Sequence, residues 1–592
     1  YIIMEEYLKI EEKINQDFIT LKSKKNKISN VRLLSFISSL VFFSLYVTSS
    51  NDLYLIISTI LFVVFIILVV ITSRISTQLT YFTQALEIIS QLKTDDSIDQ
   101  FVEDNSKFNN VYNKDLDILE GNSIFNRINK TQTRIGSLQL KYYLSNLILD
   151  KTEIIERQNA FTELAEKRDW IVTFLTFMKR LKMNQSSIFV FENRVFNNQF
   201  LKVIPSVVSA INILCFVYLA FIGFPKVIVF YWILTAVFVS SAITFVYKKQ
   251  LKRVAAYTTM KADELDNLYE VCKHIEDEIF QSKLNSEIQA TFKNPTKSSS
   301  LIKTISSTKE TLDAANFPIV GFVLNTFFLW RLNYSIKFEN EVQKTVHQIK
   351  PWLDELAKLE AFVSFALFND KFKSFTFPTI ADEPYELKIY NGFHPLLNEE
   401  TVVKNDFETN RPNNIAIITG ANMAGKSTFL RTIGTNLVLA MNGLKVSANK
   451  MSFYPMDLFT SIRTADNLSS GDSYFKNEIN KLKILIDRLE DNQPQIIILD
   501  EILKGTNSED KLIGSQKFLE KLIQSPTKLI GFIATHDLEL TKMENDNPAH
   551  IINYCFELKN IDNNYFSDYK LRKGTTKMMN AIFLMKQYKI ID

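Results

Sequence analysis

The chain has 592 residues, which is too many for one hydrophobic core, because domains usually hold about 100–200 residues. Its formal net charge of +3 is too small to indicate nucleic-acid binding by overall charge, so a surface for an anionic partner would have to be a local basic patch. With only 14 glycines and 13 prolines, we expect a mainly helical molecule with one α/β part. The three cysteines, Cys215, Cys272 and Cys555, lack metal-ligand spacing and suit a reducing compartment.

Four uncharged apolar runs near the N-terminus and in the middle of the chain predict two transmembrane helical hairpins. Each run has about the 20 residues that a helix needs to cross the hydrocarbon layer. Burial in a soluble core is the alternative, but paired charge-free runs of this length are unusual there. The runs lie between Arg32 and Asp52, Asp52 and Arg74, Lys202 and Lys226, and Lys226 and Lys248.

Basic residues gather at the open ends of both hairpins, whereas the two tips carry only Asp52 and Lys226. By the positive-inside rule, this distribution predicts an integral membrane protein with four spans and its bulk in the cytoplasm. A fifth apolar stretch, residues 317–330, is too short to cross and contains Asn325 and Thr326. We expect a core helix or a membrane-surface helix there.

Residues 415–419 form an apolar run that predicts a buried strand, and it leads directly into the pattern GxxxxGK[ST]. In this strand-to-helix context the pattern predicts a phosphate-binding loop, in which Lys426 bridges the β- and γ-phosphates of ATP and Ser427 ligates Mg²⁺. The residues expected to bind the nucleotide are Gly420, Ala421, Asn422, Met423, Ala424, Gly425, Lys426, Ser427 and Thr428.

Two further predicted strands end in polar residues. Residues 495–499 lead into Asp500 and Glu501, and residues 529–534 lead to His536. Asp500 is the second expected Mg²⁺ ligand, Glu501 the base that activates the attacking water, and His536 a group that senses the γ-phosphate. Acid pairs at strand ends are common and a single histidine is more often structural, but their position after the phosphate loop favours catalytic roles.

These segments resemble the MutS family. Residues 419–431, TGANMAGKSTFLR, are similar to its phosphate loop, and GFHPL at 392–396, Asn405-Asp406, DEILKGTNS at 500–508 and YKLRKG at 569–574 are similar to its other ATPase segments. Residues 463–479 resemble the family's signature region, in which Ser473 opens a helix that contains Phe475 and Glu478. The resemblance implies that Ser473 reaches the nucleotide of a second subunit, hence a homodimer; an ordinary amphipathic surface helix is the alternative.

The resemblance also extends upstream to the family's helical core domain, so that in all it covers residues 110–200 and 260–592, interrupted by the second hairpin. The expected fold is therefore α plus α/β, a MutS-core-like helical region with two inserted hairpins followed by a P-loop, ABC-type α/β ATPase domain. The expected divisions are 1–32 N-terminal helix, 33–73 first hairpin, 74–202 first core part, 203–247 second hairpin, 248–385 second core part, and 386–592 ATPase domain.

The sequence also departs from the family. No counterpart of the N-terminal mismatch-reading domain is recognisable, and Val402 and Val403 occupy the place where many members offer an aromatic ring to the adenine.

The favoured hypothesis is a membrane-anchored, dimeric ATPase clamp that binds double-stranded or branched DNA, the DNA being implied by the family alone. A component of an ABC-type transporter and a nucleotide-gated membrane scaffold without nucleic acid are the alternatives.

Overall fold

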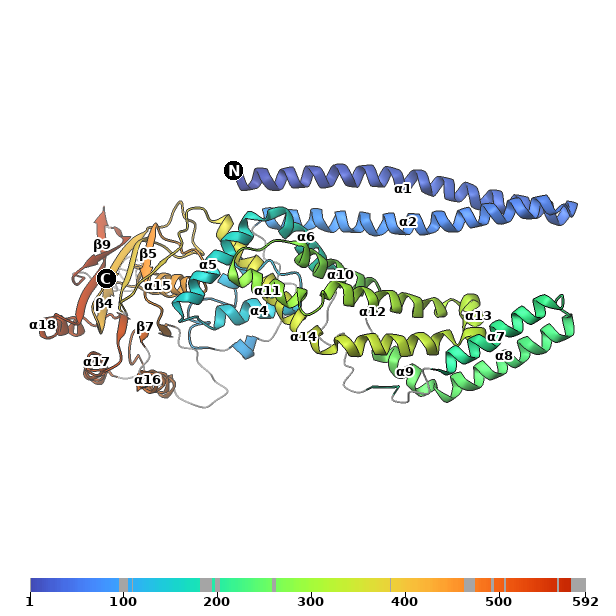
Figure 1. The fold of residues 1–592 in the computed structure, drawn as a ribbon. Coiled ribbons are helices and arrows are strands. Elements are labelled where there is room, and N and C mark those ends of the chain that lie inside the picture. The colour runs from blue at the N-terminus through green and yellow to red at the C-terminus, as the bar shows by residue number, and fades with distance from the viewer. Residues whose placement is uncertain are drawn as a thin grey trace.

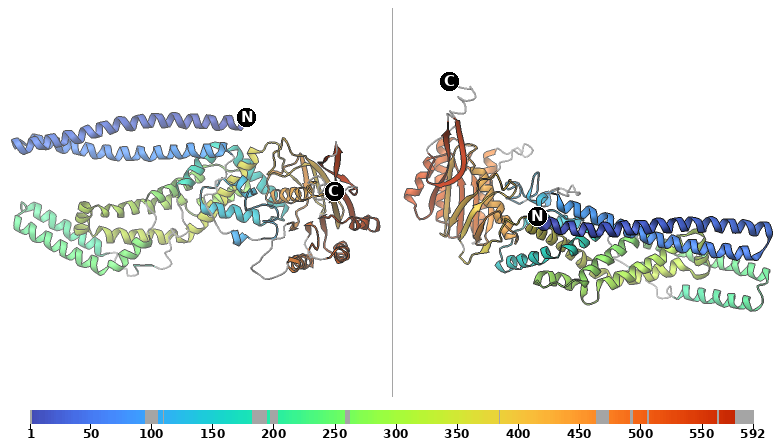
Figure 2. Two further views of the ribbon diagram at one scale, coloured as in Figure 1. Left: turned by 180° about the vertical axis from the view of Figure 1, so that it is seen from behind. Right: turned by 90° about the horizontal axis from the view of Figure 1, so that it is seen from above.

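The computed structural model describes residues 2–94, 105–108, 110–181, 194–196, 203–257, 262–383, 385–462, 474–490, 494–504, 507–561 and 564–576. The molecule is elongated, with an α/β domain at one end and a long helical region that ends in two helical hairpins at the other (Figure 1). The views in Figure 2 confirm that both hairpin tips lie at the end remote from the sheet.

The first hairpin consists of α1 (Ile2–Ser49) and α2 (Asp52–Lys93). The Asn51 side chain caps α2 by accepting a hydrogen bond from the Leu53 amide. Within the part of the hairpin nearest its tip, Ser39 and Ser58 each donate to the other's backbone carbonyl, so these hydroxyls are satisfied between the helices. The expected N-terminal helix and the first apolar run belong to one continuous helix, α1.

The second hairpin consists of α7 (Ile204–Phe221) and α8 (Lys226–Val246), close to the expected bounds of 203–247. Among the described residues, α1, α2, α7 and α8 are the four helices that are long and apolar enough to cross a membrane. Their apolar side chains are largely exposed; Leu214 and Phe238, for example, are 68% and 75% exposed.

The helical region between the hairpins and the α/β domain is built from short helices packed around one long helix. The long helix, α14 (Trp330–Lys371), continues through Pro351 and is contacted by α4, α5, α11 and α12. It is preceded by α13 (Pro318–Phe328), which covers most of the fifth apolar stretch. The other helices are α3 (Ile124–Ile128), α4 (Arg134–Ser145), α5 (Lys151–Glu166), α6 (Arg168–Arg180), α9 (Lys248–Tyr257), α10 (Ala262–Asp277), α11 (Lys283–Lys293) and α12 (Ser298–Asp313).

The α/β domain contains two sheets. The smaller has the order β1-β5-β2-β3, and the larger has the order β10-β9-β4-β8-β7-β6, in which only the β9–β10 pair is antiparallel. The strands are β1 (Thr379–Ile380), β2 (Leu387–Gly392), β3 (Asn405–Thr409), β4 (Asn414–Gly420), β5 (Lys450–Phe453), β6 (Asp457–Ser461), β7 (Gln495–Asp500), β8 (Leu529–Ala534), β9 (Ile551–Ile561) and β10 (Asn564–Lys573). The helices are α15 (Lys426–Met441), α16 (Tyr474–Glu490), α17 (Ser508–Ile523) and α18 (Met543–Asp546).

The α/β domain and the helical region share one hydrophobic core, which includes residues from α4, α14, α15 and the large sheet. Polar contacts also cross the junction. The Asp115 carboxylate accepts hydrogen bonds from the Thr460 hydroxyl (2.8 Å) and the Ile462 amide (3.0 Å), and Asn369 of α14 bonds both the amide and the ammonium group of Lys445. The two parts are therefore packed as one body at this junction.

Candidate functional site

The largest sheet gathers the predicted catalytic segments at one edge. Strand β8 lies between β4 and β7, and all three run parallel, with Ile418 and Asp500 both opposite Ala534. The phosphate loop, the acid pair and His536 follow the C-terminal ends of these strands, the position at which open α/β sheets bind ligands. A cavity of about 660 Å³ opens there, a size that suits a nucleotide.

The phosphate loop takes backbone conformations that only glycine adopts easily. Gly420 has φ +152°, and a Cβ there would lie 2.8 Å from the carbonyl oxygen of Phe556. Gly425, with φ +114°, is the residue before α15, so the loop turns directly into the helix N-terminus. Met423 at the loop tip is 89% exposed. The expected strand, loop and helix are thus present, with the loop amides at the start of α15.

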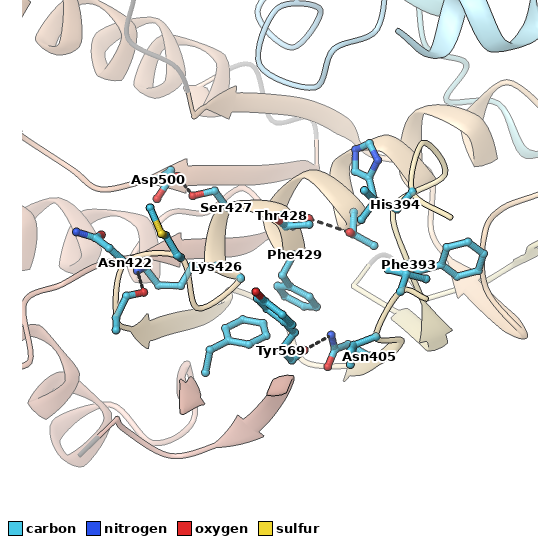
Figure 3. Close-up of a pocket in the computed structure, with 18 of the residues that line it drawn as sticks. Phe393, His394, Asn405, Asn422, Lys426, Ser427, Thr428, Phe429, Asp500 and Tyr569 are labelled. Carbon is cyan, nitrogen blue, oxygen red and sulfur yellow. Dashed lines mark hydrogen bonds between the residues drawn. The ribbon is translucent and has the colours of Figure 1, made fainter. Parts of the chain in front are cut away.

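Lys426 lies at the centre of the cavity, almost fully buried (Figure 3). Its ammonium group donates to the carbonyls of Gly420 (2.8 Å) and Ala421 (3.2 Å) and lies 3.2 Å from Nε2 of His536. Burial lowers the pKa of Lys426, although Asp500 and Glu501 oppose that shift. A buried ammonium whose acceptors are neutral carbonyls is well suited to a stronger, anionic partner such as a phosphate.

Ser427 and Asp500, the two predicted Mg²⁺ ligands, are adjacent. The Ser427 hydroxyl donates to Oδ2 of Asp500 at 2.5 Å, as Figure 3 shows. A hydroxyl and a carboxylate are the hard oxygen donors that Mg²⁺ prefers, and the pair lines the same cavity as Lys426. The donor set therefore fits this ion.

Glu501 adopts a strained conformation that turns its side chain toward the cavity. Its φ is +61°, and its amide donates to the Ala534 carbonyl at 2.9 Å, which fixes the end of β7 against β8. Its carboxylate lies 3.8 Å from Nε2 of His536 and 4.0 Å from the ammonium of Lys504. Burial and Lys426 lower the pKa of His536, so its imidazole is uncharged at neutral pH.

The opposite wall of the cavity carries a residue that our sequence reasoning overlooked, Tyr569. It lies in an irregular part of the β9–β10 pairing with φ +51°, and its ring lies beside Gly425, where an added Cβ would be 3.3 Å from Cδ1 of the ring. The Asn405 amide donates to the Tyr569 carbonyl at 2.9 Å and its oxygen accepts from the Leu571 amide at 2.8 Å (Figure 3). Asn405 of the ND segment thus holds Tyr569 at the mouth of the cavity. The YKLRKG pattern named this residue but gave no sign of where its ring would lie.

The remaining wall comes from the GFHPL segment and the chain that follows it. Val402 and Val403 line the cavity, as does Phe393, whose carbonyl accepts from Asn436 (3.1 Å). His394 is buried, and burial together with Arg431 lowers its pKa to about 4, so it is a neutral structural residue. Although positions 402 and 403 are valines, Phe393 and Tyr569 line the same cavity and can offer an aromatic ring to the adenine base.

The predicted signature helix is present as α16, while Ser473 and the segment before it lie outside the described residues. Glu478 is buried within its own chain, where its carboxylate accepts from the Leu503 amide at 2.6 Å. Leu503, with φ +59°, is two residues beyond Glu501. The signature helix therefore supports the strained turn that carries the acid pair.

Comparison with known proteins agrees with this geometry. A family model described as MutS domain V matches residues 416–587. The chain is similar to proteins named DNA mismatch repair protein MutS from Clostridium perfringens (32% identical over 45% of this chain and 30% of the relative), Thermotoga neapolitana (31%, over 35% and 26%) and Clostridioides difficile (31%, over 38% and 24%). The matched part thus spans less than a third of these relatives.

The matched domain and the site agree on one chemistry. The phosphate loop, the acid pair and the histidine all lie within the matched residues, and they surround a single cavity. MutS domain V is an ATPase domain, so the expectation of an ATP-hydrolysing enzyme is confirmed. Residues 416–587 of this chain thus match MutS domain V, an ATPase domain.

Proposed function

We propose that this protein is a membrane-anchored MutS-family ATPase that works as a homodimeric, ATP-driven clamp on double-stranded or branched DNA. The observation that carries the proposal is the joint placement of Lys426, Glu501 and His536 around one cavity in a domain V, at the end of a molecule whose other end exposes two long apolar hairpins.

In the proposed reaction, the loop amides and Lys426 hold the phosphates of ATP at the start of α15. Glu501 accepts a proton from a water molecule as its oxygen attacks the γ-phosphorus, and the bond to the bridging oxygen of ADP breaks. His536 lies within reach of both Lys426 and Glu501 and, being uncharged, can report whether the γ-phosphate is present. Ser427 and Asp500 would hold Mg²⁺, which neutralises phosphate charge when bound.

The membrane part of the proposal rests on exposed apolar surface. Burying such surface is favourable by about 25 cal/mol for each Å², and a water-soluble molecule rarely leaves large contiguous apolar patches exposed. The exposed side chains on α1, α2, α7 and α8 form long apolar faces, and both hairpins point the same way (Figures 1 and 2). Two hairpins that enter a bilayer from one side would leave the ATPase domain in the cytoplasm, consistent with the basic residues at their bases.

The DNA part of the proposal rests on the similarity to proteins named for DNA mismatch repair. In the helical region, Lys130, Arg134 and Lys141 are candidates for contacts with DNA phosphates. Two of them do not face solvent: Lys130 donates to the Gln91 carbonyl, and the Lys141 ammonium lies 4.9 Å from the centre of the Phe125 ring. Both are buried, so they stabilise the helical region instead. Arg134 is exposed at the start of α4 and stays a candidate for a phosphate contact.

A transporter is the less favoured function. Residues 33–51 and 53–73 of the first hairpin, and the apolar runs of the second, contain no ionisable carboxylate, lysine, arginine or histidine that would mark a polar pathway. Figures 1 and 2 also show the two hairpins as separate pairs instead of a closed bundle.

Steady-state ATP turnover by the full chain in phospholipid vesicles tests the DNA assignment. The rate would be measured with mismatched duplex, homoduplex, branched DNA and no DNA, at two salt concentrations because phosphate contacts weaken with salt. We expect at least one DNA to change the rate. A rate that no DNA alters, together with no binding of labelled DNA, would overturn the clamp and favour the scaffold.

A further inference from the structure

Helix α13 has one face covered by protein and one face that is apolar and exposed. Ile319, Val320, Phe322 and Val323 are between 45% and 82% exposed, although the helix contains no charged residue. On its covered side Gly321 packs against the Ala315 carbonyl so closely that a Cβ would lie 2.1 Å from the oxygen. The close contact at Gly321 fixes which side of α13 faces the protein, so the apolar side is left exposed. Contact between these apolar side chains and water is unfavourable.

The C-terminal end of α13 lies beside the middle of the second hairpin. The Phe327 ring is 4.9 Å from the Trp232 ring of α8, and the Phe327 carbonyl accepts a hydrogen bond from Asn212 of α7 at 3.1 Å. Asn212 is eight residues beyond Ile204, which is about 12 Å along an α-helix that rises about 1.5 Å per residue. Because α7 has 18 residues, this contact is near its midpoint.

Polar side chains of α7 satisfy the end of α13 at that depth. A helix leaves its last carbonyls without partners of its own. Here Asn212 donates to the Phe327 carbonyl, and the Ser209 hydroxyl, which lies 2.7 Å from the Pro205 carbonyl of its own helix, is also within 3.3 Å of the Phe328 carbonyl. The Asn212 oxygen in turn accepts from the Trp232 indole at 3.2 Å. Pairing of this kind is what an apolar medium requires of backbone and amide groups, since no water is available there.

We propose that α13 is a re-entrant membrane segment, whose exposed face of Ile319, Val320, Phe322 and Val323 contacts lipid acyl chains in the leaflet nearest the ATPase domain. The inference rests on the proposed insertion of the second hairpin, because α13 takes its depth from α7 and α8. The chain bends by 83° between α13 and α14, and both α12 and α14 lead back toward the helical region (Figure 1). The segment thus enters and leaves on one side.

Three charged residues next to α13 have polar partners, which lowers the cost of placing them near an apolar medium. Lys309 pairs with Asp313 at 2.8 Å, and the Arg331 guanidinium donates to the side-chain oxygen of Asn316 at 3.2 Å. Lys309 and Asp313 precede α13, whereas Arg331 follows its C-terminal end at the start of α14 and reaches back to Asn316 with its side chain. A long arginine side chain can also extend toward the headgroups.

Site-specific fluorescence tests the proposal in the full chain. A thiol-reactive, polarity-sensitive dye would be attached to three single replacements, Ile319→Cys on α13, Phe238→Cys on α8 and Ile279→Cys in the helical region, which replace residues that are 75–82% exposed. Cys215 would be replaced by alanine, while Cys272 and Cys555 stay, because both are buried and burial raises the pKa of the Cys272 thiol to about 12. The vesicles would contain phosphatidylcholine and phosphatidylglycerol, with bromine on part of the acyl chains.

We expect the dyes at positions 319 and 238 to be quenched by the brominated lipid, and the dye at 279 by iodide in the water. If 238 responds to lipid while 319 responds to iodide or to neither quencher, the α13 proposal is overturned and membrane anchoring stands. If 238 also responds to iodide, anchoring itself fails, and α13 with it. The Asn212→Leu variant removes the hydrogen bond to the Phe327 carbonyl, so lipid quenching at 319 should fall. The Ser240→Ala variant removes a hydroxyl that, among the described residues, donates to the Val237 carbonyl of its own helix, and it should leave the quenching unchanged.

Discussion

At the scale of single residues, the site contains strained backbone conformations and closely spaced titratable side chains. Glu501 and Leu503 both have positive φ, and the turn that contains them is fastened by the Ala534 carbonyl on one side and the Glu478 carboxylate on the other. Such conformations cost roughly 1–3 kcal/mol each and persist only where the surroundings hold them. The turn directs Glu501 toward His536 and Lys426 and away from solvent.

Replacing Glu501 with glutamine should leave ATP binding intact and slow hydrolysis. The amide keeps the shape of the side chain but cannot accept the proton of the attacking water, and general bases contribute about 10²–10⁴-fold to rates. Equilibrium nucleotide binding and single-turnover hydrolysis would measure the two effects separately. Glu509→Gln, an exposed carboxylate in the first turn of α17, is the matched control. Normal turnover by Glu501→Gln would show that another group activates the water.

Tyr569→Ala should weaken ATP binding by about 3–10-fold, since an aromatic contact is worth about 0.5–1.5 kcal/mol. The ring is about half exposed at the cavity mouth, where it can offer the base the surface that Val402 and Val403 lack. Tyr569→Phe keeps the ring and should bind normally. The dissociation constant of a fluorescent ATP analogue, compared with that of a triphosphate lacking the base, would check this. Equal losses for both ligands would assign Tyr569 to the phosphates.

At the scale of elements, the start of α4 is attached to α14 through a buried carboxylate. Glu360 accepts hydrogen bonds from the Thr133 amide (3.0 Å), the Thr133 hydroxyl (2.5 Å) and the Gln132 amide, and it approaches Gly136 so closely that a Cβ there would lie 1.9 Å from Oε2. Gly136 and Glu360 belong to the two segments that resemble the beginning and the last helix of the MutS core. Their contact explains why a glycine stands in a helix at this point.

Glu360 should make stability depend on pH. Burial raises its pKa to about 7 from 4.5, despite the three hydrogen bonds that favour the ionised form. The folded state then binds the proton more tightly than the unfolded state, so this contribution is complete below about pH 4.5 and is lost as pH rises toward 7, by at most about 1.4 kcal/mol per pH unit. Urea unfolding of the detergent-solubilised protein between pH 5 and 8 would follow the loss. Glu360→Gln should flatten this dependence; an unchanged pH profile in that variant would exclude Glu360 as its source.

At the scale of the whole molecule, one uninterrupted helix connects the proposed membrane segment with the ATPase domain. Helix α14 begins directly after α13, and near its C-terminal end Asn369 bonds Lys445, which follows α15 in the chain. The phosphate loop lies at the other end of α15. A displacement of either the phosphate loop or α13 can therefore be transmitted to the other through α15 and α14. This path is a consequence of packing and joins segments that the sequence keeps far apart.

Dimer formation should depend on bound ATP. Met423 at the tip of the phosphate loop is 89% exposed, which leaves this side of the cavity open to a second copy. The Glu501→Gln variant with Mg-ATP should accumulate as a dimer in light scattering of the detergent-solubilised protein, whereas Glu501→Gln combined with Lys426→Ala should remain monomeric because the phosphates lose their buried cation. If both variants gave the same mass with and without ATP, nucleotide-driven closure between copies would be excluded.

The sequence by itself determined the features that depend on short stretches of chain. The strand, loop and helix around residues 414–441, the acid pair and the four long apolar helices follow from local patterns, because glycine placement, apolar runs and charge-free lengths act over a few tens of residues at most. Tertiary structure alone decided the rest. It brought Asn405 to Tyr569 across 164 residues, Glu360 to Thr133 across 227, and Asn212 to Phe327 across 115. Each of these contacts joins a polar side chain to a distant backbone group, a pairing that requires the fold because neither partner carries a pattern that names the other.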